Sequence, residues 1–424
     1  MSDNSFVDYY SLLKQNDPAI YSALIGEQQR QQDGIELIPA ENYTYPEVLG
    51  LLGSVFTNKY SEGYPGRRYY GGQEFTDNIE DIARERACKL FRAEHANVQP
   101  LSGSPMNQAV YLALLEPGDT ILAMELSHGG HLTHGAPVSH MGRLFDFVRY
   151  KTDPSSGEID FDHLRKLALT RKPKLILCGY SSYPRDLDYL KFKNIADECG
   201  AFTMADVSHI GGLVAGNVMN NPLDAGFDVM TTTSHKSLRG PRGGIILSSQ
   251  DLSKKIDASV FPGLQGGPHM NQVAATAFTL LKASEPAFKR YSQDILDNAQ
   301  QLATSLSDAG VSLITGGTEN HLLVVNTIDS FGIDGNKAEA VLDAVGITTN
   351  KQVIPDDPLP PLRPSGIRIG TPAATTRGMN KADMKKIAAW MVAVIKNRDK
   401  PEQLETIASH VKNLCRQFPI PGLK

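Results

Sequence analysis

The sequence predicts an α/β fold in which helices cover both faces of a mostly parallel, seven-stranded sheet. Short apolar runs and amphipathic segments of helix length alternate between about residues 119 and 206, which is typical of repeated strand–helix units. With 424 residues, the chain exceeds the length at which one hydrophobic core keeps growing, so a second, smaller domain is expected. A hydrophobic content of 41% and a charged content of 21% are ordinary for a globular protein.

Charge and composition argue against several classes of partner and compartment. The net charge of −5 leaves no basic stripe, so we expect no nucleic-acid partner. The apolar runs have the length of strands, so we expect no membrane span. The four cysteines form no CxxC pair, and the first residues lack the basic and apolar regions of a secretory signal. These features together predict a cytoplasmic protein.

The first residues are expected to form an arm. Residues 5–32 have the pattern of an amphipathic helix with little core of its own, so we expect it to pack on something else, such as a second subunit. Residues 35–43 are predicted to be extended, and residues 46–56 to be helical. The predicted division of the chain is an N-terminal arm over 1–56, a large domain over 57–284 and a small domain over 285–424.

A loop rich in tyrosine and glycine is predicted over residues 57–72, before a helix over 76–92. Four tyrosines, four glycines and two arginines in sixteen residues do not have the composition of a core. Loops with such side chains often serve a site, and Glu62 and Tyr70 are the candidates here. The alternative is an ordinary surface turn.

A turn of Ser102, Gly103 and Ser104 opens an apolar helix that runs to Leu115. Its hydroxyls and backbone N–H groups stand at the positive end of the helix, which suits a phosphate. Such turns are also common helix caps, so that alternative stays open.

The next stretch alternates strand and helix. We expect strands at 119–124, 145–150, 174–180 and 201–206, and helices at 161–171 and 188–199. Active sites in parallel sheets gather at the carboxyl ends of the strands, and Asp206 ends the last of these four. A carboxylate there is the right group to pair with a protonated pyridine nitrogen. The alternative is a structural carboxylate at a strand end.

Three histidines, His128, His131 and His134, lie within seven residues after the first of these strands. Their spacing, with intervening glycines and no cysteine nearby, makes a poor tetrahedral zinc set, so no metal is expected. We prefer a loop in which one imidazole stacks on a flat ligand.

Lys236 is predicted to lie on a tight connection between two buried strands, Phe227–Thr233 and Gly244–Ser248. Lysines rarely lie between buried strands. Partial burial and the neighbouring His235, Arg239 and Arg242 would lower the pKa of the amine, as a nucleophilic lysine requires. We interpret Lys236 as the Schiff-base lysine of a pyridoxal phosphate site, the alternative being a solvated lysine at a strand end.

The remaining residues predict a glycine- and proline-rich loop and then the small domain. The loop covers 258–269; the elements are helices at 270–283 and 285–309, strands at 311–315 and 321–326, a helix at 336–345, a strand at 346–349, a proline-rich loop at 353–364, a strand at 366–369, and helices at 380–397 and 401–416. Arg368 lies within an otherwise apolar strand, and a buried arginine must be paired. Its partner is either a substrate carboxylate held by two hydrogen bonds or an internal salt bridge.

Several motifs resemble the serine hydroxymethyltransferase family, in order, from about residue 30 to about residue 395. They are Asn58-Lys59-Tyr60-Ser61-Glu62-Gly63-Tyr64-Pro65-Gly66, Tyr69-Tyr70-Gly71-Gly72, His128-Gly129-Gly130-His131-Leu132-Thr133-His134-Gly135, the stretch around Lys236, and Phe261-Pro262-Gly263-Leu264-Gln265-Gly266-Gly267-Pro268. The resemblance implies the aspartate-aminotransferase fold (fold type I), pyridoxal 5'-phosphate as cofactor and tetrahydrofolate as co-substrate.

The resemblance also implies a role for individual residues. Lys236 would carry the cofactor as a Schiff base, Asp206 would pair with its nitrogen, and His131 would stack on its ring. The other residues implied in cofactor binding are Ser181 and His209 near the 3-oxygen, Ser102, Gly103, Ser104 and His235 at the phosphate, and Gly266 and Gly267 of a second subunit.

The resemblance further implies how the substrates would bind. Arg368 would hold the substrate carboxylate, with Arg242 helping to position the substrate. From a second subunit, Tyr60, Glu62 and Tyr70 would reach in, with Glu62 as acid and base at the substrate hydroxyl, in a homodimer or tetramer. Leu126, Gly130, Leu132 and Gln352 would line the folate site.

Four positions depart from the pattern of that family, and they keep other activities open. Ala40 lacks a hydroxyl that helps bind the substrate carboxylate, and Ser208 replaces a small apolar residue under the ring. Pro105-Met106 replaces Gln-Ala, and Gln352 replaces an asparagine that contacts the pterin. The alternatives are a hydroxymethyltransferase for α-methylserine, a folate-independent aldolase of β-hydroxy amino acids, and a catalytically silent homologue.

Overall fold

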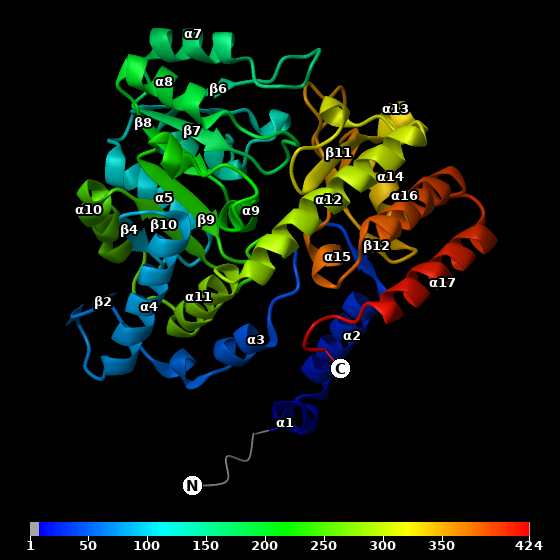
Figure 1. The fold of residues 1–424 in the computed structure, drawn as a ribbon, viewed down its shortest axis with the longest axis horizontal. Helices are drawn as coiled ribbons and strands as arrows, with labels where there is room; N and C mark the ends of the chain where they lie inside the picture. The colour runs from blue at the N-terminus through cyan, green and yellow to red at the C-terminus, as the bar shows by residue number, and fades with distance from the viewer. Residues whose placement is uncertain (1–7, 424) are drawn as a thin grey trace.

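The structure is a computed structural model that describes residues 8–423. Its centre is a seven-stranded sheet with the order β4 (His95–Asn97), β10 (Gly244–Ser248), β9 (Val229–Thr233), β8 (Phe202–Asp206), β7 (Leu175–Gly179), β5 (Thr120–Met124) and β6 (Asp146–Tyr150). Only β10 runs antiparallel to its neighbours among these strands. The predicted mostly parallel sheet is therefore confirmed (Figure 1).

Inner strands such as β5 and β7 are almost entirely apolar because both faces of the sheet are buried. In β5, Leu122 and Met124 face one core, and Ile121 and Ala123 face the other, since successive side chains point to opposite faces. The first core is completed by α4 (Glu74–Phe91), α8 (Tyr189–Cys199) and α11 (Met270–Ala283), the second by α5 (Gly103–Leu114) and α10 (Ser253–Ala258).

A third core lies around a smaller antiparallel sheet of order β11 (Leu322–Asn326), β14 (Gly366–Gly370) and β13 (Asn350–Gln352). The helices that cover it are α12 (Pro286–Asp308), α14 (Gly335–Asp343), α16 (Lys381–Lys396) and α17 (Pro401–Gln417). Ile35 of β1 (Ile35–Glu36) joins this core, because β1 pairs with β12 (Ile347–Thr348). The predicted boundaries after residues 56 and 284 stay predictions.

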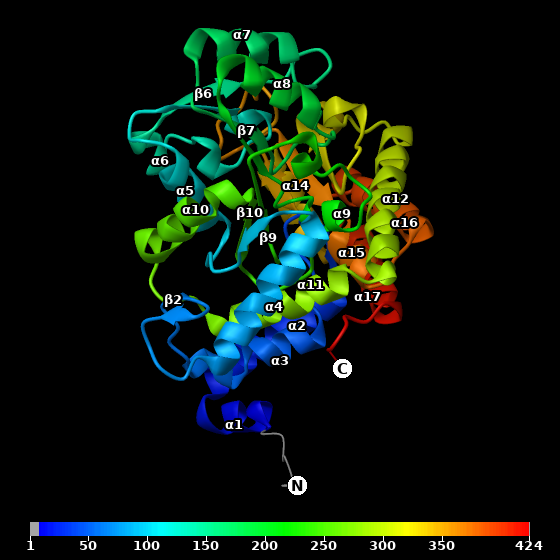
Figure 2. The same cartoon turned by 60° about the vertical axis from the view of Figure 1, so that its left-hand side comes forward.

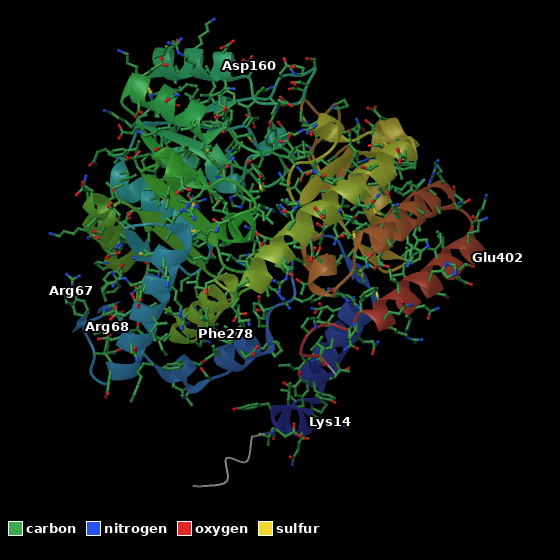
Figure 3. All side chains as sticks on the ribbon, in the orientation of Figure 1. Lys14, Arg67, Arg68, Asp160, Phe278 and Glu402 are labelled. Carbon is green, nitrogen blue, oxygen red and sulfur yellow. The ribbon has the colours of Figure 1, made fainter. Side chains whose placement is uncertain are left out.

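The N-terminal helix differs from the single helix expected over residues 5–32. It consists of α1 (Tyr9–Asn16) and α2 (Pro18–Asp33), and residues 5–7 lie outside the described part of the chain. The break has a local cause, since Pro18 disfavours a helical conformation at Asp17, whose side chain accepts a hydrogen bond from Ile20 N and caps α2. In two views α1 protrudes from the rest of the molecule, and Lys14 marks that extremity (Figures 2 and 3).

The expected strand over 311–315 is wrong. Thr315 has φ +61° and begins a run of left-handed residues with Gly316, which ends an extended conformation. Only Leu313 forms a bridge, to Val325 of β11.

The other elements described have the following bounds: α3 (Pro46–Leu52), β2 (Gly63–Tyr64), β3 (Arg67–Arg68), α6 (Met141–Leu144), α7 (Phe161–Arg171), α9 (Gly211–Ala215), α13 (Thr327–Phe331) and α15 (Pro372–Thr376). Within residues 8–423, no helix combines the length and the apolar character that crossing a membrane requires.

Candidate active site

The carboxyl edge of the large sheet collects the chemically active side chains. The strands β5, β7, β8 and β9 are parallel, so the segments that follow them emerge at one edge. His131, Ser181 and Lys236 lie in the segments after β5, β7 and β9, and Asp206 is the last residue of β8. Arg368 comes from β14 of the smaller sheet and reaches the same place, because its guanidinium donates to the carbonyl oxygen of Ser181.

Lys236 lies in the turn between β9 and β10 and is only 9% exposed. Burial lowers the pKa of its amine to about 8; the charge of Asp206 opposes this effect, and the charges of Arg368 and Arg242 add to it. This burial argues against a solvated lysine. An amine with such a pKa is partly neutral near pH 7, as nucleophilic attack on an aldehyde requires.

Two of the three residues expected to lower this pKa do not do so by charge. Burial, followed by the charge of Lys236, lowers the pKa of His235 to about 3, so its imidazole is neutral. The guanidinium of Arg239 faces the arm instead, where it lies 4.3 Å from the ring centroid of Tyr45. The cation that sequence analysis did not associate with Lys236 is Arg368, which is remote in sequence and whose charge lowers the pKa of the amine.

Asp206 is a buried, ionised carboxylate. Its Oδ2 accepts hydrogen bonds from Asn107 Nδ2 at 2.8 Å and from His134 Nε2 at 3.1 Å, and its Oδ1 accepts one from Ser208 N at 3.0 Å. Burial alone would raise the pKa of Asp206, but the hydrogen bond and charge of His134 hold it well below its usual range. Such a group suits the protonated nitrogen of a bound ring.

Asn107 and His134 were not predicted as site residues. The side chain of Asn107 also donates to Thr133 Oγ1 and accepts from Thr231 Oγ1, so it is fully occupied in holding this network together. The only sequence signal was local: Asn107 follows the Ser102–Ser104 turn by one helical turn, and His134 is the last histidine of its loop.

The ligand nitrogens and oxygen of His131, His134 and Asp206 lie within 4.8 Å of one another, which raises the question of a metal again. Backbone N–H groups donate to Nδ1 of both histidines, from Thr133 to His131 and from His131 to His134, each at 3.2 Å. Nδ1 of each histidine is therefore taken up by the chain, and Nε2 of His134 is taken up by Asp206. Of the two histidines, His134 is the one that hydrogen-bonds to Asp206, and the expected absence of a metal stays a prediction.

His131 offers a neutral, flat ring. Burial, followed by the charge of His134, lowers its pKa to about 4. The ring centroid lies 5.6 Å from that of His134, with the planes 64° apart. An uncharged imidazole in this setting can stack on an aromatic ligand.

The start of α5 and the residue before Lys236 form a place for an anion. Ser102 caps α5 without a side-chain hydrogen bond, and Ser104 is exposed at the first turn. Nδ1 of His235 is buried and has no hydrogen-bond partner. A Cβ at Gly103 would lie 2.9 Å from Thr233 Cγ2, so this turn packs directly on β9. These donors fit a phosphate, and with Lys236 and Asp206 they fit pyridoxal phosphate.

Ser181 and His209, which the resemblance places at the 3-oxygen of the ring, already have partners in the chain. The Ser181 hydroxyl donates to the carbonyl of Gly130 at 2.8 Å, and so retains only acceptor capacity. Nδ1 of His209 lies 3.2 Å from Nε2 of His321. Nε2 of His209 makes no hydrogen bond within residues 8–423.

Arg368 is held by neutral groups only. Its Nε donates to Asn350 Oδ1 at 3.1 Å and its Nη1 to the Ser181 carbonyl, and within the described residues no carboxylate pairs with it. Burial lowers its pKa to about 10. The internal salt bridge considered above is therefore absent from the described chain, and the guanidinium keeps donors for a ligand carboxylate.

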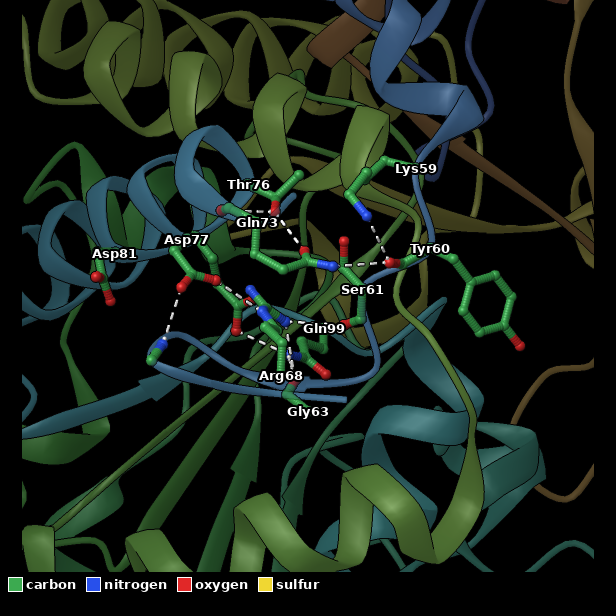
Figure 4. A network of polar contacts seen from close by, with 12 residues as sticks. Lys59, Tyr60, Ser61, Gly63, Arg68, Gln73, Thr76, Asp77, Asp81 and Gln99 are labelled. Atoms are coloured by element: carbon green, nitrogen blue, oxygen red, sulfur yellow. Dashed lines mark hydrogen bonds and ion pairs between the residues drawn. The ribbon is translucent and has the colours of Figure 1, made fainter. Parts of the chain in front are cut away.

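The loop over residues 57–72 is held rigidly at its base. Arg68 is buried and donates to Asp77 at 2.8 Å, to Glu80 at 2.6 Å and to the carbonyls of Ser61 and Gly63 (Figure 4). The ring of Tyr60 projects away from this network (Figure 4). These hydrogen bonds of Arg68 therefore fix the backbone on both sides of Glu62, while the ring of Tyr60 remains free for another partner.

Five of the predicted residues gather around that loop. The rings of Tyr60 and Tyr70, which are 56% and 48% exposed, lie 5.0 Å apart. A Cβ at Gly266 would lie 3.3 Å from Glu62 Oε1, and one at Gly267 would lie 3.6 Å from Glu62 Cγ. The charge of Glu62 raises the pKa of Tyr60. In the described chain, no hydrogen bond or ion pair joins this cluster to Lys236.

The residues predicted to bind folate and to position the substrate differ in how exposed they are. Leu126 and Leu132 are exposed, whereas Gly130 is buried. Nε2 of Gln352 donates to the adjacent Val353 carbonyl at 2.9 Å. Arg242 is exposed.

Two of the departures from the family pattern have a structural setting. Ser208 Oγ accepts a hydrogen bond from Thr233 N at 3.2 Å, so this hydroxyl ties β8 to β9. Ala40 follows Pro39, whose ring packs against Gly370 at the end of β14, two residues beyond Arg368.

Comparison with known proteins gives one family. Residues 13–391 match the family model described as serine hydroxymethyltransferase. A protein with the name serine hydroxymethyltransferase from Acidobacterium capsulatum is 48% identical over 410 residues, which cover 97% of this chain and 96% of that protein. Another with the same name, from Rhodopirellula baltica, is 49% identical over 412 residues, 97% of this chain and 98% of that protein.

Proposed function

The chain belongs to the serine hydroxymethyltransferase family, and from this premise we propose that it interconverts L-serine and glycine. In this reaction serine loses its β-carbon, tetrahydrofolate takes up that one-carbon unit with loss of water, and a proton on the α-carbon completes glycine. The observation that carries the proposal is the meeting of Lys236, Asp206 and an unpaired Arg368 at one edge of the sheet.

Pyridoxal phosphate is the proposed cofactor, held by Lys236 at its aldehyde carbon, by Asp206 at its nitrogen, and by Ser102, Ser104 and His235 at its phosphate. When bound, it supplies an electron sink for the negative charge that develops at the substrate α-carbon. Asp206 supports that role because its pKa stays low, so the proton between it and the ring resides on the ring. The stacking surface of His131 limits where the ring can lie, and the close packing of Gly103 on the Thr233 side chain limits where the phosphate can lie.

The substrate is proposed to bind through its two ends. Arg368 orients the carboxylate with the donors that Asn350 and Ser181 leave open. Glu62 holds the proton of the β-hydroxyl and returns it, with Tyr70 beside it and Arg242 helping to position the amino acid. Leu126, Gly130, Leu132 and Gln352 are proposed to line the place of tetrahydrofolate.

Glu62, Tyr60, Tyr70, Gly266 and Gly267 are proposed to act in the site of a second subunit. Two observations support a homodimer, or a tetramer of two dimers. The cluster exposes its tyrosine rings, and apolar side chains of α1 and α2 such as Tyr9, Ile20 and Leu24 are exposed as well. The four cysteines are free, which supports a reducing compartment such as the cytoplasm.

A second candidate keeps the same cofactor but acts on α-methylserine, or cleaves β-hydroxy amino acids without folate. Ala40 favours it, because a methyl group replaces a hydroxyl near the end of the strand that carries Arg368. A catalytically silent homologue is disfavoured by the intact Lys236, Asp206 and Arg368.

The deciding experiment measures turnover of L-serine, α-methyl-L-serine and L-allo-threonine with and without tetrahydrofolate. The proposed function requires serine turnover that depends on folate and exceeds that of α-methylserine. Equal turnover of α-methylserine, or folate-independent cleavage of L-allo-threonine as the fastest reaction, would favour the second candidate. Lys236→Ala is the blank for all three substrates.

A further inference from the structure

His321 is a buried residue to which neither the motifs nor the proposed function gives a role. It precedes β11 and is 0% exposed, and its Nε2 lies 3.2 Å from Nδ1 of His209. The two rings are tilted by 30°, with centroids 5.4 Å apart. The pair connects the smaller sheet with the loop after β8, beside Asp206.

The position of His321 is fixed from both sides. The adjacent Asn320 donates to Tyr180 Oη and to the Tyr183 carbonyl, each at 3.0 Å, and both partners follow β7. The carbonyl of His321 accepts a hydrogen bond from Thr371 N at 3.1 Å, just after β14. The imidazole therefore meets His209 in a set geometry.

Only one hydrogen can lie between the two imidazoles, and which ring carries it decides which nitrogen of His209 is protonated. Burial, followed by the charges of Arg368 and Lys236, lowers the pKa of His321 to about 3, and burial also lowers that of His209. Both rings are thus neutral, with one N–H each. Nδ1 of His321 is buried without a partner. A buried unpaired acceptor is tolerated better than a buried unpaired N–H, so the hydrogen of His321 belongs on Nε2.

We propose that His321 is a positioning residue that fixes the tautomer of His209. His321 Nε2–H donates to Nδ1 of His209, which places the hydrogen of His209 on Nε2. That N–H has no acceptor within residues 8–423, and it is the donor that an anionic oxygen of the bound cofactor or amino acid requires. Without His321, His209 can present a lone pair to that oxygen instead, and the contact becomes repulsive.

The proposal rests on the proposed function only in assuming that an anionic ligand binds beside His209. Neutron diffraction from crystals of the full-length enzyme with pyridoxal phosphate would locate the hydrogens directly. Deuterium on Nε2 of both His209 and His321 is expected. Deuterium on Nδ1 of His209 would overturn the proposal, and this measurement needs no variant that must fold.

The functional test is the affinity for pyridoxal phosphate, measured by titration, with the absorbance of the bound cofactor followed against pH. His321→Leu should bind about tenfold more weakly, because the donor of His209 is no longer fixed. His321→Gln can still donate to His209 Nδ1 and should restore affinity to within about threefold. The matched control is His163→Leu, at an exposed position on α7.

Affinity of His321→Leu equal to that of the natural protein, or an equal loss in the Leu and Gln variants, would contradict the proposal. Cofactor affinity and tautomer do not depend on turnover of serine. A failure of this inference is therefore distinguishable from a failure of the proposed reaction.

Discussion

The amine of Lys236 and the guanidinium of Arg368 are two cations in one buried place, and burial is the largest influence on each. Burial lowers their pKa values to about 8 and about 10, and Asp206 supplies the compensating negative charge. Two cations near one carboxylate leave a net positive site. A substrate carboxylate is therefore favoured there before any specific contact is made.

The first prediction concerns the pH at which Lys236 reacts. Below pH 8 its ammonium form dominates and has no lone pair, so the rate at which the apoenzyme combines with pyridoxal phosphate should rise through about pH 8 and then level. Stopped-flow absorbance measures this rate. An exposed lysine in a model peptide, whose ordinary pKa is 10.5, is the control and should continue to rise. A profile for the enzyme that matches the peptide would contradict the burial of the amine.

The second prediction concerns the neutral partner of Arg368. Asn350→Asp places a carboxylate on Nε of Arg368 and creates the internal ion pair that the described chain lacks. The KM for the amino acid should increase about tenfold or more, because the new carboxylate competes with that of the substrate, while kcat changes less. Asn413→Asp, at an exposed position of α17, is the matched charge control. An unchanged KM would mean that Arg368 does not hold the substrate carboxylate.

Some site residues could be predicted from the chain alone and others could not. Lys236 and Asp206 stand out because a charged side chain beside a buried strand is unusual at its own position. Asn107 and His321 give no such signal, since each is an ordinary polar residue next to an apolar segment. Their partners Asp206 and His209 are 99 and 112 positions away in sequence, and only the packing of the fold brings them together.

At the scale of elements, the arm clamps the turn that carries Lys236. Asn42 Nδ2 donates to the Lys236 carbonyl at 3.0 Å, and Thr44 Oγ1 donates to the Arg239 carbonyl at 2.9 Å. In return, Arg239 Nε donates to the Tyr43 carbonyl at 2.8 Å. Three residues upstream of α3 thus bind both ends of one turn, although the sequence predicted only an extended segment there.

The third prediction removes this clamp. Arg239→Ala and Arg239→Gly should each release pyridoxal phosphate several-fold faster, because the turn loses a charged hydrogen bond and the contact with Tyr45. Arg239 has φ +65°, which glycine adopts freely, so the Gly variant separates loss of the side chain from backbone strain. Arg239→Lys should be intermediate. Release is followed by the loss of cofactor absorbance during dilution; a rate unchanged in the Gly variant would exclude the clamp.

The predicted ends of most helices and strands lie within two residues of the observed ends, because local residues such as caps, glycines and prolines determine where these elements end. The strand expected over 311–315 failed for a non-local reason. A strand requires a neighbouring strand with which to exchange hydrogen bonds. Past Leu313, which forms a bridge to Val325 of β11, the chain turns away at Thr315. Likewise the helix expected over 5–32 has two parts because Pro18 disfavours a helical conformation at Asp17.

At the scale of the whole molecule, Arg377 joins the two ends of the chain. Its buried guanidinium donates to the carbonyls of Gln32 and Gly34 at the end of α2, and to those of Cys415 and Phe418 at the end of α17. A cation at two helix C-termini is favoured by both helix dipoles. The arm is thereby anchored at residue 34, while α1 and much of α2 extend outward with exposed apolar side chains, as a segment that meets a second subunit would.

The fourth prediction tests whether two subunits share each site. Glu62 lies against Gly266 on a projecting loop, whereas Arg368 meets Lys236 within one chain. If Glu62 serves the neighbouring subunit, the homodimers Lys236→Ala and Glu62→Gln are both inactive, yet their mixed dimer has one intact site of two. Random assembly of equal amounts should then recover about a quarter of the natural activity.

The matched control for this mixing experiment pairs Lys236→Ala with Arg368→Ala. Both residues belong to the site of a single chain, so one site of the mixed dimer lacks the lysine and the other lacks the arginine. No activity should return, which makes this pair a blank for the recovery expected with Glu62→Gln. The converse experiment mixes a Lys236→Ala, Glu62→Gln double variant with the natural chain.

 

The double variant gives the converse result. Mixed in equal amounts with the natural chain, it should leave about a quarter of the activity if Glu62 crosses to the neighbour, because both sites of the mixed dimer are then broken. About half would remain if Glu62 served its own chain, and that outcome, or no recovery in the first mixture, would contradict the shared site.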